Sequence, residues 1–153
     1  MLSRIVFAIA LLSASQSIAQ GSVRELSGSG TVFASAARTA TANSTTQTNS
    51  LARGVVLWMD VTVFDRTTGD EVMDCKVQVG DPVSGVFTDL ASAAWAQVAS
   101  ATPATTALTI YPGIGETANV SVSDVLPGRW RVRCVLGGNT PSATFSIGYD
   151  YIP

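Results

Sequence analysis

The side chains of this 153-residue chain that could carry chemistry are eleven acidic residues, nine basic residues and two cysteines. The chain has no histidine, so it lacks the commonest general base and metal ligand at neutral pH. This absence excludes serine–histidine and cysteine–histidine catalysis. Two cysteines without histidine also argue against a zinc site. We therefore expect no enzyme activity and no cofactor.

The acidic residues offer two candidate sites, and neither has a complete pattern. Asp65, Asp70, Glu71 and Asp74 gather around one predicted turn, where carboxylate oxygens could bind calcium. Their spacing matches no recognised calcium loop. Asp60 stands among apolar neighbours in a predicted strand, where burial would shift its pKa. Acid–base catalysis needs a second carboxylate across a cleft, and none is identifiable, so we predict neither a metal site nor a catalytic site.

The basic residues show the clearest pattern. Arg129, Arg131 and Arg133 alternate with apolar residues that begin at Trp130 and end at Cys134. In a β-strand this alternation buries one set of side chains and turns the other set outward. A row of arginines suits a partner contact, because the planar guanidinium group binds carboxylates through two hydrogen bonds.

A second interpretation of the arginine row is an ordinary solvated strand face. Charged side chains on such a face keep a sheet from aggregating. Lys76 and Asp74 are predicted to point outward from a neighbouring strand. If that strand pairs near the arginine row, these residues would neutralise it internally.

Cys75 and Cys134 both fall on the apolar phase of predicted strands. Inward cysteines on two strands can join the sheets of a sandwich, as in immunoglobulin-type domains. A bond that closes so long a loop stabilises by about 4 kcal/mol in the chain-entropy model. The alternative is a pair of buried free thiols that pack as small apolar side chains.

Residues 1–20 resemble a secretory signal peptide. Arg4 supplies a positive start, residues 5–12 are apolar, and Ser17 and Ala19 are small residues at the two positions that a signal peptidase reads. The apolar run is too short to span a bilayer. The segment is either removed on export, leaving a mature start at Gln20, or retained as an apolar arm.

Residues 21–52 are rich in serine, threonine and alanine. A segment with so few large apolar side chains buries too little surface to offset its ordering entropy. We expect an extended arm that is either disordered or ordered on a partner. Val32 and Phe33 could anchor one short strand within it.

Residues 53–153 have the texture of an all-β domain. Short apolar segments recur with turn residues between them, which is typical of an antiparallel β-sandwich of immunoglobulin-like or jelly-roll-like type. Val55, Leu57, Met59, Val61 and Val63 are expected on one face of the first strand. The segment 91–101 favours either a helix or a loop with a strand, and we predict the strand. The expected strands are residues 54–64, 71–79, 86–90, 95–98, 107–111, 117–122, 129–136 and 142–152.

From about Thr31 onward the chain resembles a group of small tailed-bacteriophage virion proteins that are encoded among head and structural genes. Each matching block is short, but their order extends over roughly four-fifths of the chain. The blocks are residues 34–40, 47–49, 53–55, 57–62, 77–79, 81–85, 90–94, 111–113, 124–127, 130–132 and 146–148.

The resemblance implies a virion structural protein with a β-sandwich fold, most of all a capsid decoration or cement protein. The expected partners are the major capsid protein or other virion proteins, with a homo-oligomer as the working form. The two cysteines and the signal-like start depart from the family pattern. Because virion assembly in the cytoplasm needs no export, the resemblance favours a retained arm at residues 1–20 and a location on the capsid surface.

Two other functions stay open. The signal-like start and the cysteine pair also suit a secreted or periplasmic immunoglobulin-like module that adheres to a surface. A minor tail or head-fibre component is the third candidate. The net charge of −2 and the isoelectric point near 4.8 argue against direct nucleic-acid binding, which usually needs a clearly basic surface.

Overall fold

The computed structural model describes residues 28–153, in which every regular element is a β-strand. The segment 1–20 and the first residues of the segment 21–52 lie outside the described residues. No helix that could span a membrane occurs within the described range. The strands are β1 (Ser29–Arg38), β2 (Ala42–Asn43), β3 (Gln47–Thr48), β4 (Gly54–Asp65), β5 (Val72–Gly80), β6 (Phe87–Ala94), β7 (Ala104–Ile110), β8 (Ser121–Val122), β9 (Arg129–Gly137) and β10 (Ser142–Ile152).

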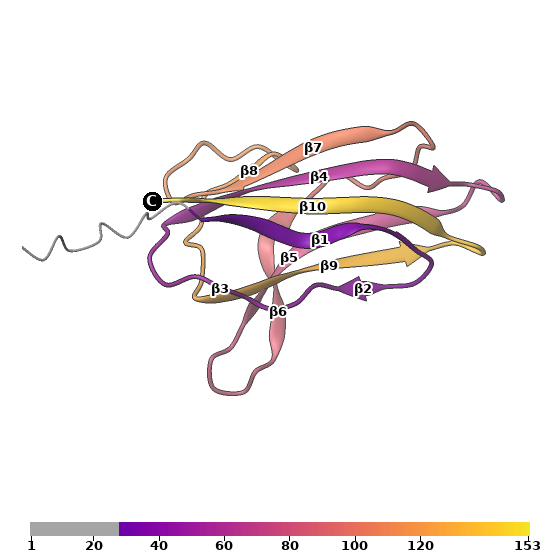
Figure 1. Cartoon of the computed structure of the whole chain (residues 1–153). Coiled ribbons are helices and arrows are strands. Elements are labelled where there is room, and N and C mark those ends of the chain that lie inside the picture. The colour runs from indigo at the N-terminus through magenta and orange to yellow at the C-terminus, as the bar shows by residue number, and fades with distance from the viewer. Residues whose placement is uncertain (1–27) are drawn as a thin grey trace, which may run out of the picture.

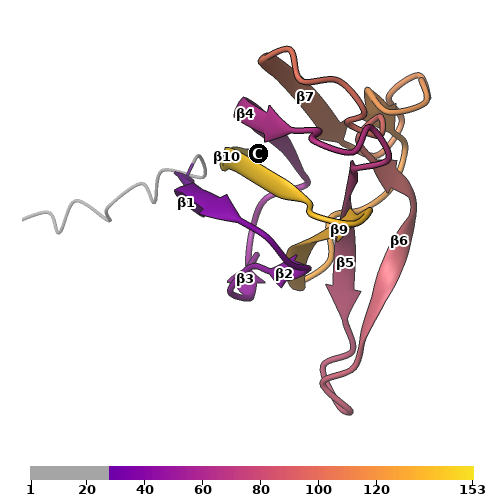
Figure 2. The same ribbon diagram turned by 90° about the vertical axis from the view of Figure 1, so that its right-hand side faces the viewer.

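The strands form two sheets that lie in two layers (Figures 1 and 2). The β4 sheet has the order β1-β10-β4-β7-β8, and the β9 sheet has the order β2-β9-β5-β6, with β3 also on β9. All pairs are antiparallel except β7 with β8. The predicted all-β, mostly antiparallel architecture is therefore confirmed.

The core lies between the two layers and is built by alternating side chains from both sheets. In β9, Trp130, Val132 and Cys134 are fully buried, because the strand's period of two turns them all to the same side. β4 and β10 contribute in the same way from the opposite layer. The largest fully buried side chains include Trp130, Phe145, Leu57, Met59, Met73, Leu108 and Ile110.

Residues 29–48 belong to the sheets, whereas their composition suggested an extended arm with at most one short strand. β1 pairs with β10 from Ser29 to Arg38. A register shift between Thr31 and Phe33 in this pairing lets the consecutive residues Val32 and Phe33 both be buried, at 6% and 7% exposure. The ladder pairs the backbone groups, which compensates for the small side chains.

A similar irregularity corrects the predicted face of β4. Val63 was expected inward with the preceding apolar residues, but it is 56% exposed and Phe64 is buried instead. The pairing of β10 with β4 shifts register between Thr144 and Phe145. A bulge of this kind adds one residue to one strand and exchanges the faces beyond it.

Two expected strands are shorter or placed differently. Residues 117–122 contain only β8, because a tight turn closes with the Thr117 amide donating to the Ser121 carbonyl and Asn119 at a φ of 63°. Val120 is consequently exposed. The strand expected at residues 95–98 is not formed: β6 ends at Ala94, and Val98 makes only an isolated bridge with β5.

Candidate functional site

The arginine row lies on the outer face of the β9 sheet, as the alternation in β9 predicts. Arg129, Arg131 and Arg133 are half-buried, and the residues between them are fully buried. Strand β5 lies beside β9, with Gln78 opposite Arg131 and Lys76 opposite Arg133. We call the outer surface formed by these five residues the arginine face.

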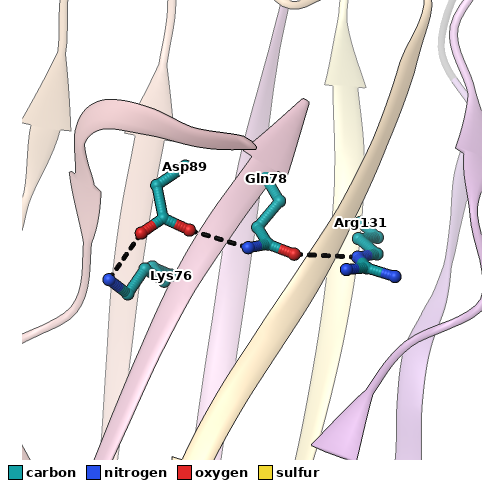
Figure 3. A network of polar contacts seen from close by, with 4 residues as sticks. All are labelled: Lys76, Gln78, Asp89 and Arg131. Atoms are coloured by element: carbon teal, nitrogen blue, oxygen red, sulfur yellow. Dashed lines mark hydrogen bonds and ion pairs between the residues drawn. The ribbon is translucent and has the colours of Figure 1, made fainter. Parts of the chain in front are cut away.

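A chain of hydrogen bonds crosses the arginine face from β9 to β6 (Figure 3). Arg131 Nε donates to Gln78 Oε1 at 2.9 Å, and Gln78 Nε2 donates to Asp89 Oδ1 at 2.7 Å. Asp89 Oδ2 lies 2.6 Å from Lys76 Nζ in an ion pair. Gln78 is only 4% exposed, so its amide group has fixed partners on both sides.

Asp89 is one carboxylate that partly neutralises this face, and Asp81 also feels the positive charge of Arg129. The hydrogen bond from Lys76 and then the one from Gln78 hold the pKa of Asp89 below its ordinary value, and the positive charge of Arg133 acts in the same direction. Sequence reasoning assigned this role to Asp74, which instead accepts hydrogen bonds from Gln97. The signal for Asp89 was the β5–β6 hairpin register, which places it opposite Gln78.

The Phe87 ring packs against the side chains of Arg131 and Arg129 on the outer side of the β9 sheet. The ring lies over Gly80, where an added Cβ atom would approach a ring carbon to 2.9 Å. The Arg131 guanidinium carbon is 4.1 Å from the ring centroid, and that of Arg129 is 6.0 Å away. Such stacking is favourable for a guanidinium group. Arg131 is thus held by a hydrogen bond to Gln78 on one edge and by an aromatic ring on one face.

The Nη groups of Arg129, Arg131 and Arg133 donate no hydrogen bond to any residue in the described part of the chain. These groups are the donors that form two-point contacts with carboxylates. The arrangement can therefore bind an acidic surface without first breaking its internal contacts.

The acidic residues near the β4–β5 turn do not converge on a metal site. Asp65 accepts a hydrogen bond from Thr67, and Asp70 accepts one from Thr68. Within residues 28–153, no group of three acidic or cysteine side chains could hold a metal ion. Asp60 lies on the outer face of β4, where it accepts a hydrogen bond from Thr105 at 2.9 Å.

Glu71 has a structural role that the sequence did not reveal. It is fully buried, and its carboxylate accepts hydrogen bonds from the Thr68 hydroxyl at 2.7 Å, the Thr68 amide at 3.1 Å and the Gly69 amide at 2.9 Å. These bonds, led by the one from the Thr68 hydroxyl, lower the pKa of Glu71 from 4.5 to about 2. The carboxylate therefore holds the turn between β4 and β5 closed.

We expect this carboxylate to make stability depend on pH. A pKa lowered by folding gives stabilisation that is complete above the ordinary value of 4.5 and is lost as the pH falls toward 2. Glu71→Gln should lower the melting temperature at pH 7 by roughly 5 °C and should differ little from the wild type near pH 2. Thermal denaturation followed by circular dichroism at pH 7, 4 and 2 measures both. Glu116→Gln, at an exposed loop residue, is the control, and an equal gap at all three pH values would contradict the assignment.

The structure joins Cys75 and Cys134 by a disulfide bond. The two residues lie directly opposite each other on β5 and β9, so the bond links neighbouring strands of one sheet and does not join the two sheets. Both are buried, at 2% and 0% exposure. The bond lies beneath the arginine face and ties together the two strands that carry it.

Comparison of the chain with family models and with curated proteins finds no match in either set.

Proposed function

We propose that this protein is a structural component of a tailed-bacteriophage virion, acting as a capsid decoration or cement protein on the surface of the head. In this proposal the two layers form a β-sandwich of immunoglobulin-like or jelly-roll-like type. The ordered blocks of family resemblance support the virion assignment. The observation that carries the docking role is the arginine face, where Arg131 is held in place and the Nη groups of the three arginines donate no hydrogen bond within the described residues.

The physics of a cement protein suits a surface of this kind. The Arg131 side chain is already fixed by Gln78 and Phe87, so it loses little conformational entropy on binding, which favours affinity. The natural partner of the arginine face is a surface rich in aspartate and glutamate, because bidentate pairs form there. Repetition around a shell multiplies a modest affinity for each contact.

Reversing the charge of Arg131 tests the docking role. We expect Arg131→Glu to weaken attachment to particles about tenfold or more, because it places a carboxylate against an acidic partner, while the protein stays folded. Quantitative mass spectrometry of purified virions measures the occupancy, and circular dichroism measures folding.

Arg53→Glu is the matched control, because Arg53 stacks on Tyr111 away from the arginine face. Unchanged occupancy of the Arg131→Glu protein would contradict the role of the arginine face. Absence of the wild-type protein from purified virions would contradict the virion assignment itself. Stoichiometry relative to the major capsid protein separates a decoration protein from a minor fibre component.

The disulfide bond supports a second candidate, an exported surface-binding module. Disulfides form and persist mainly in oxidising compartments, and the signal-like start at residues 1–20 points the same way. Amino-terminal sequencing of the natural protein separates the two candidates. A start at Gln20 favours the exported module, and a start at Met1 favours the virion protein with a retained arm.

A further inference from the structure

The outer face of the β4 sheet carries a row of side chains that complements the arginine face. Trp58 lies on the central strand β4 at 39% exposure, between the small residues Gly148 on β10 and Ala107 on β7. Asp60 follows on the same face of β4. Asp150 lies on the neighbouring strand β10, where it pairs with Val56, two residues before Trp58 on β4. We call Asp150, Trp58 and Asp60 the acidic row.

The groups of the acidic row are available to a partner. Asp150 is exposed, and no described residue donates a side-chain hydrogen bond to it. One carboxylate oxygen of Asp60 accepts a hydrogen bond from Thr105, and the other accepts no side-chain hydrogen bond from the described residues. No aromatic ring or cation of residues 28–153 stacks on Trp58, although five cation–ring contacts occur elsewhere.

The basic residues nearest the β4 sheet are occupied elsewhere. Arg38, at the end of β1, donates to three backbone carbonyls and lies over the Phe33 and Phe145 rings. Arg53 precedes β4 and stacks on Tyr111. Arg66 follows β4 and donates to the carbonyls of Ala99 and Gly69. The middle of this face is therefore acidic, whereas the arginine face is basic.

We propose that the acidic row of one copy of this chain binds the arginine face of a second copy. The inference goes beyond the proposed function and does not depend on it, because it names a second copy of this chain as a partner of the arginine face. Opposite charge on the two faces is the first argument, since like-charged faces would repel and opposite ones steer association.

Matching spacing is the second argument. Outward side chains of a strand repeat about every 6.7 Å, so Arg129, Arg131 and Arg133 are separated by two equal steps. The acidic row has the same two steps along the strand direction. Asp150 is displaced sideways by one strand, about 4.8 Å, and this distance is within the reach of an arginine side chain. Arg131 then meets Trp58 at the centre, where a cation on an indole ring is favourable. Arg129 and Arg133 then meet Asp150 and Asp60, whether β9 of one copy runs parallel or antiparallel to β4 of the other.

The two surfaces lie on opposite layers of the molecule (Figure 2). Contact between them is therefore head to tail. A dimer formed in this way still has an unused arginine face at one end and an unused acidic row at the other. Such contacts continue into rings or filaments. Three strands of about nine residues, the extent of β9, β5 and β6 that carry the arginine face and its network, cover roughly 430 Å², below the roughly 800 Å² per partner of a standard interface. We expect a dissociation constant of about 10 to 100 μM in solution.

Sedimentation velocity on the purified full chain tests the inference. The wild type should associate beyond a dimer as its concentration rises to about 1 mM, and added salt should reverse this. Asp150→Lys and Arg131→Glu should each weaken association about tenfold or more. Glu116→Lys and Arg53→Glu are the matched controls, because they make the same charge changes outside both faces, and they should behave as the wild type.

Mixing the two variants gives the sharpest result. The Asp150→Lys chain keeps an intact arginine face, and the Arg131→Glu chain keeps an intact acidic row. An equal mixture should form one-to-one dimers at the wild-type affinity, and growth should stop there.

Three results would overturn the inference: a wild type that is monomeric at 1 mM, association that neither variant weakens, or a mixture that forms no dimers. None of these results bears on the virion assignment, which is tested separately by the occupancy of the protein on purified particles. Conversely, self-association of a protein that is absent from virions would leave this inference standing and would overturn the proposed function.

Discussion

Replacing Cys75 and Cys134 together with alanine should lower the free energy of unfolding by about 4 kcal/mol. The bond joins residues 59 positions apart, so it closes a long loop and restricts the unfolded chain strongly in the chain-entropy model. In the folded protein the bond fits the sheet. The Cys75 carbonyl accepts a hydrogen bond from the Trp95 amide on the side away from β9. The two cysteines thus form a non-hydrogen-bonded pair, with Cα atoms 4.1 Å apart, and side chains are closest in such pairs.

Urea denaturation followed by tryptophan fluorescence measures this loss. The wild type with reductant should unfold at the midpoint of the double variant, and reductant should not change the variant further. Denatured, unreduced wild-type protein should contain no alkylatable thiol. Two alkylated cysteines in that sample, or a variant as stable as the oxidised wild type, would contradict the prediction.

Strict alternation is the pattern that sequence reasoning used best. It placed Trp130 and Cys134 in the core and the arginines outside, because a strand with one buried face has only one register that satisfies both sets of residues. The same reasoning failed where the pairing is irregular. Val63 and Phe64 follow a bulge that exchanges the two faces. A bulge depends on the partner strand, so the local pattern does not contain it.

The polar contacts of the candidate site were harder to predict than its position. The arginine row was visible in the sequence, but Asp89 and Phe87 act on it through the β5–β6 register. A difference of one residue in that register would send both side chains to the other face. Glu71 was missed for a related reason. An acid in a predicted turn is usually exposed, and only the folded turn surrounds it with donors.

Trp130→Ala should destabilise the protein by about 3–5 kcal/mol, the usual cost of truncating a buried tryptophan. Trp130 is fully buried. Its ring meets Tyr149 and Tyr151 edge to face, at centroid distances of 5.5 and 6.2 Å. Its Nε1–H group donates to the Tyr151 hydroxyl at 3.1 Å, which in turn donates to the Thr48 carbonyl at 3.1 Å. One side chain of the β9 sheet thereby anchors β10 in the opposite layer and β3 at the edge.

Two further variants separate packing from hydrogen bonding in urea denaturation experiments. Trp130→Phe keeps an aromatic ring but removes the indole donor, so it should lose about 1–2 kcal/mol. Trp58→Ala removes the same side chain type from the outer face of β4, where it is 39% exposed, and should cost less than about 1 kcal/mol. If truncation at Trp58 were as costly as truncation at Trp130, the core would not lie between the two layers as described. The difference between the two tryptophans follows from the faces they occupy, because each lies in a strand that is paired on both sides.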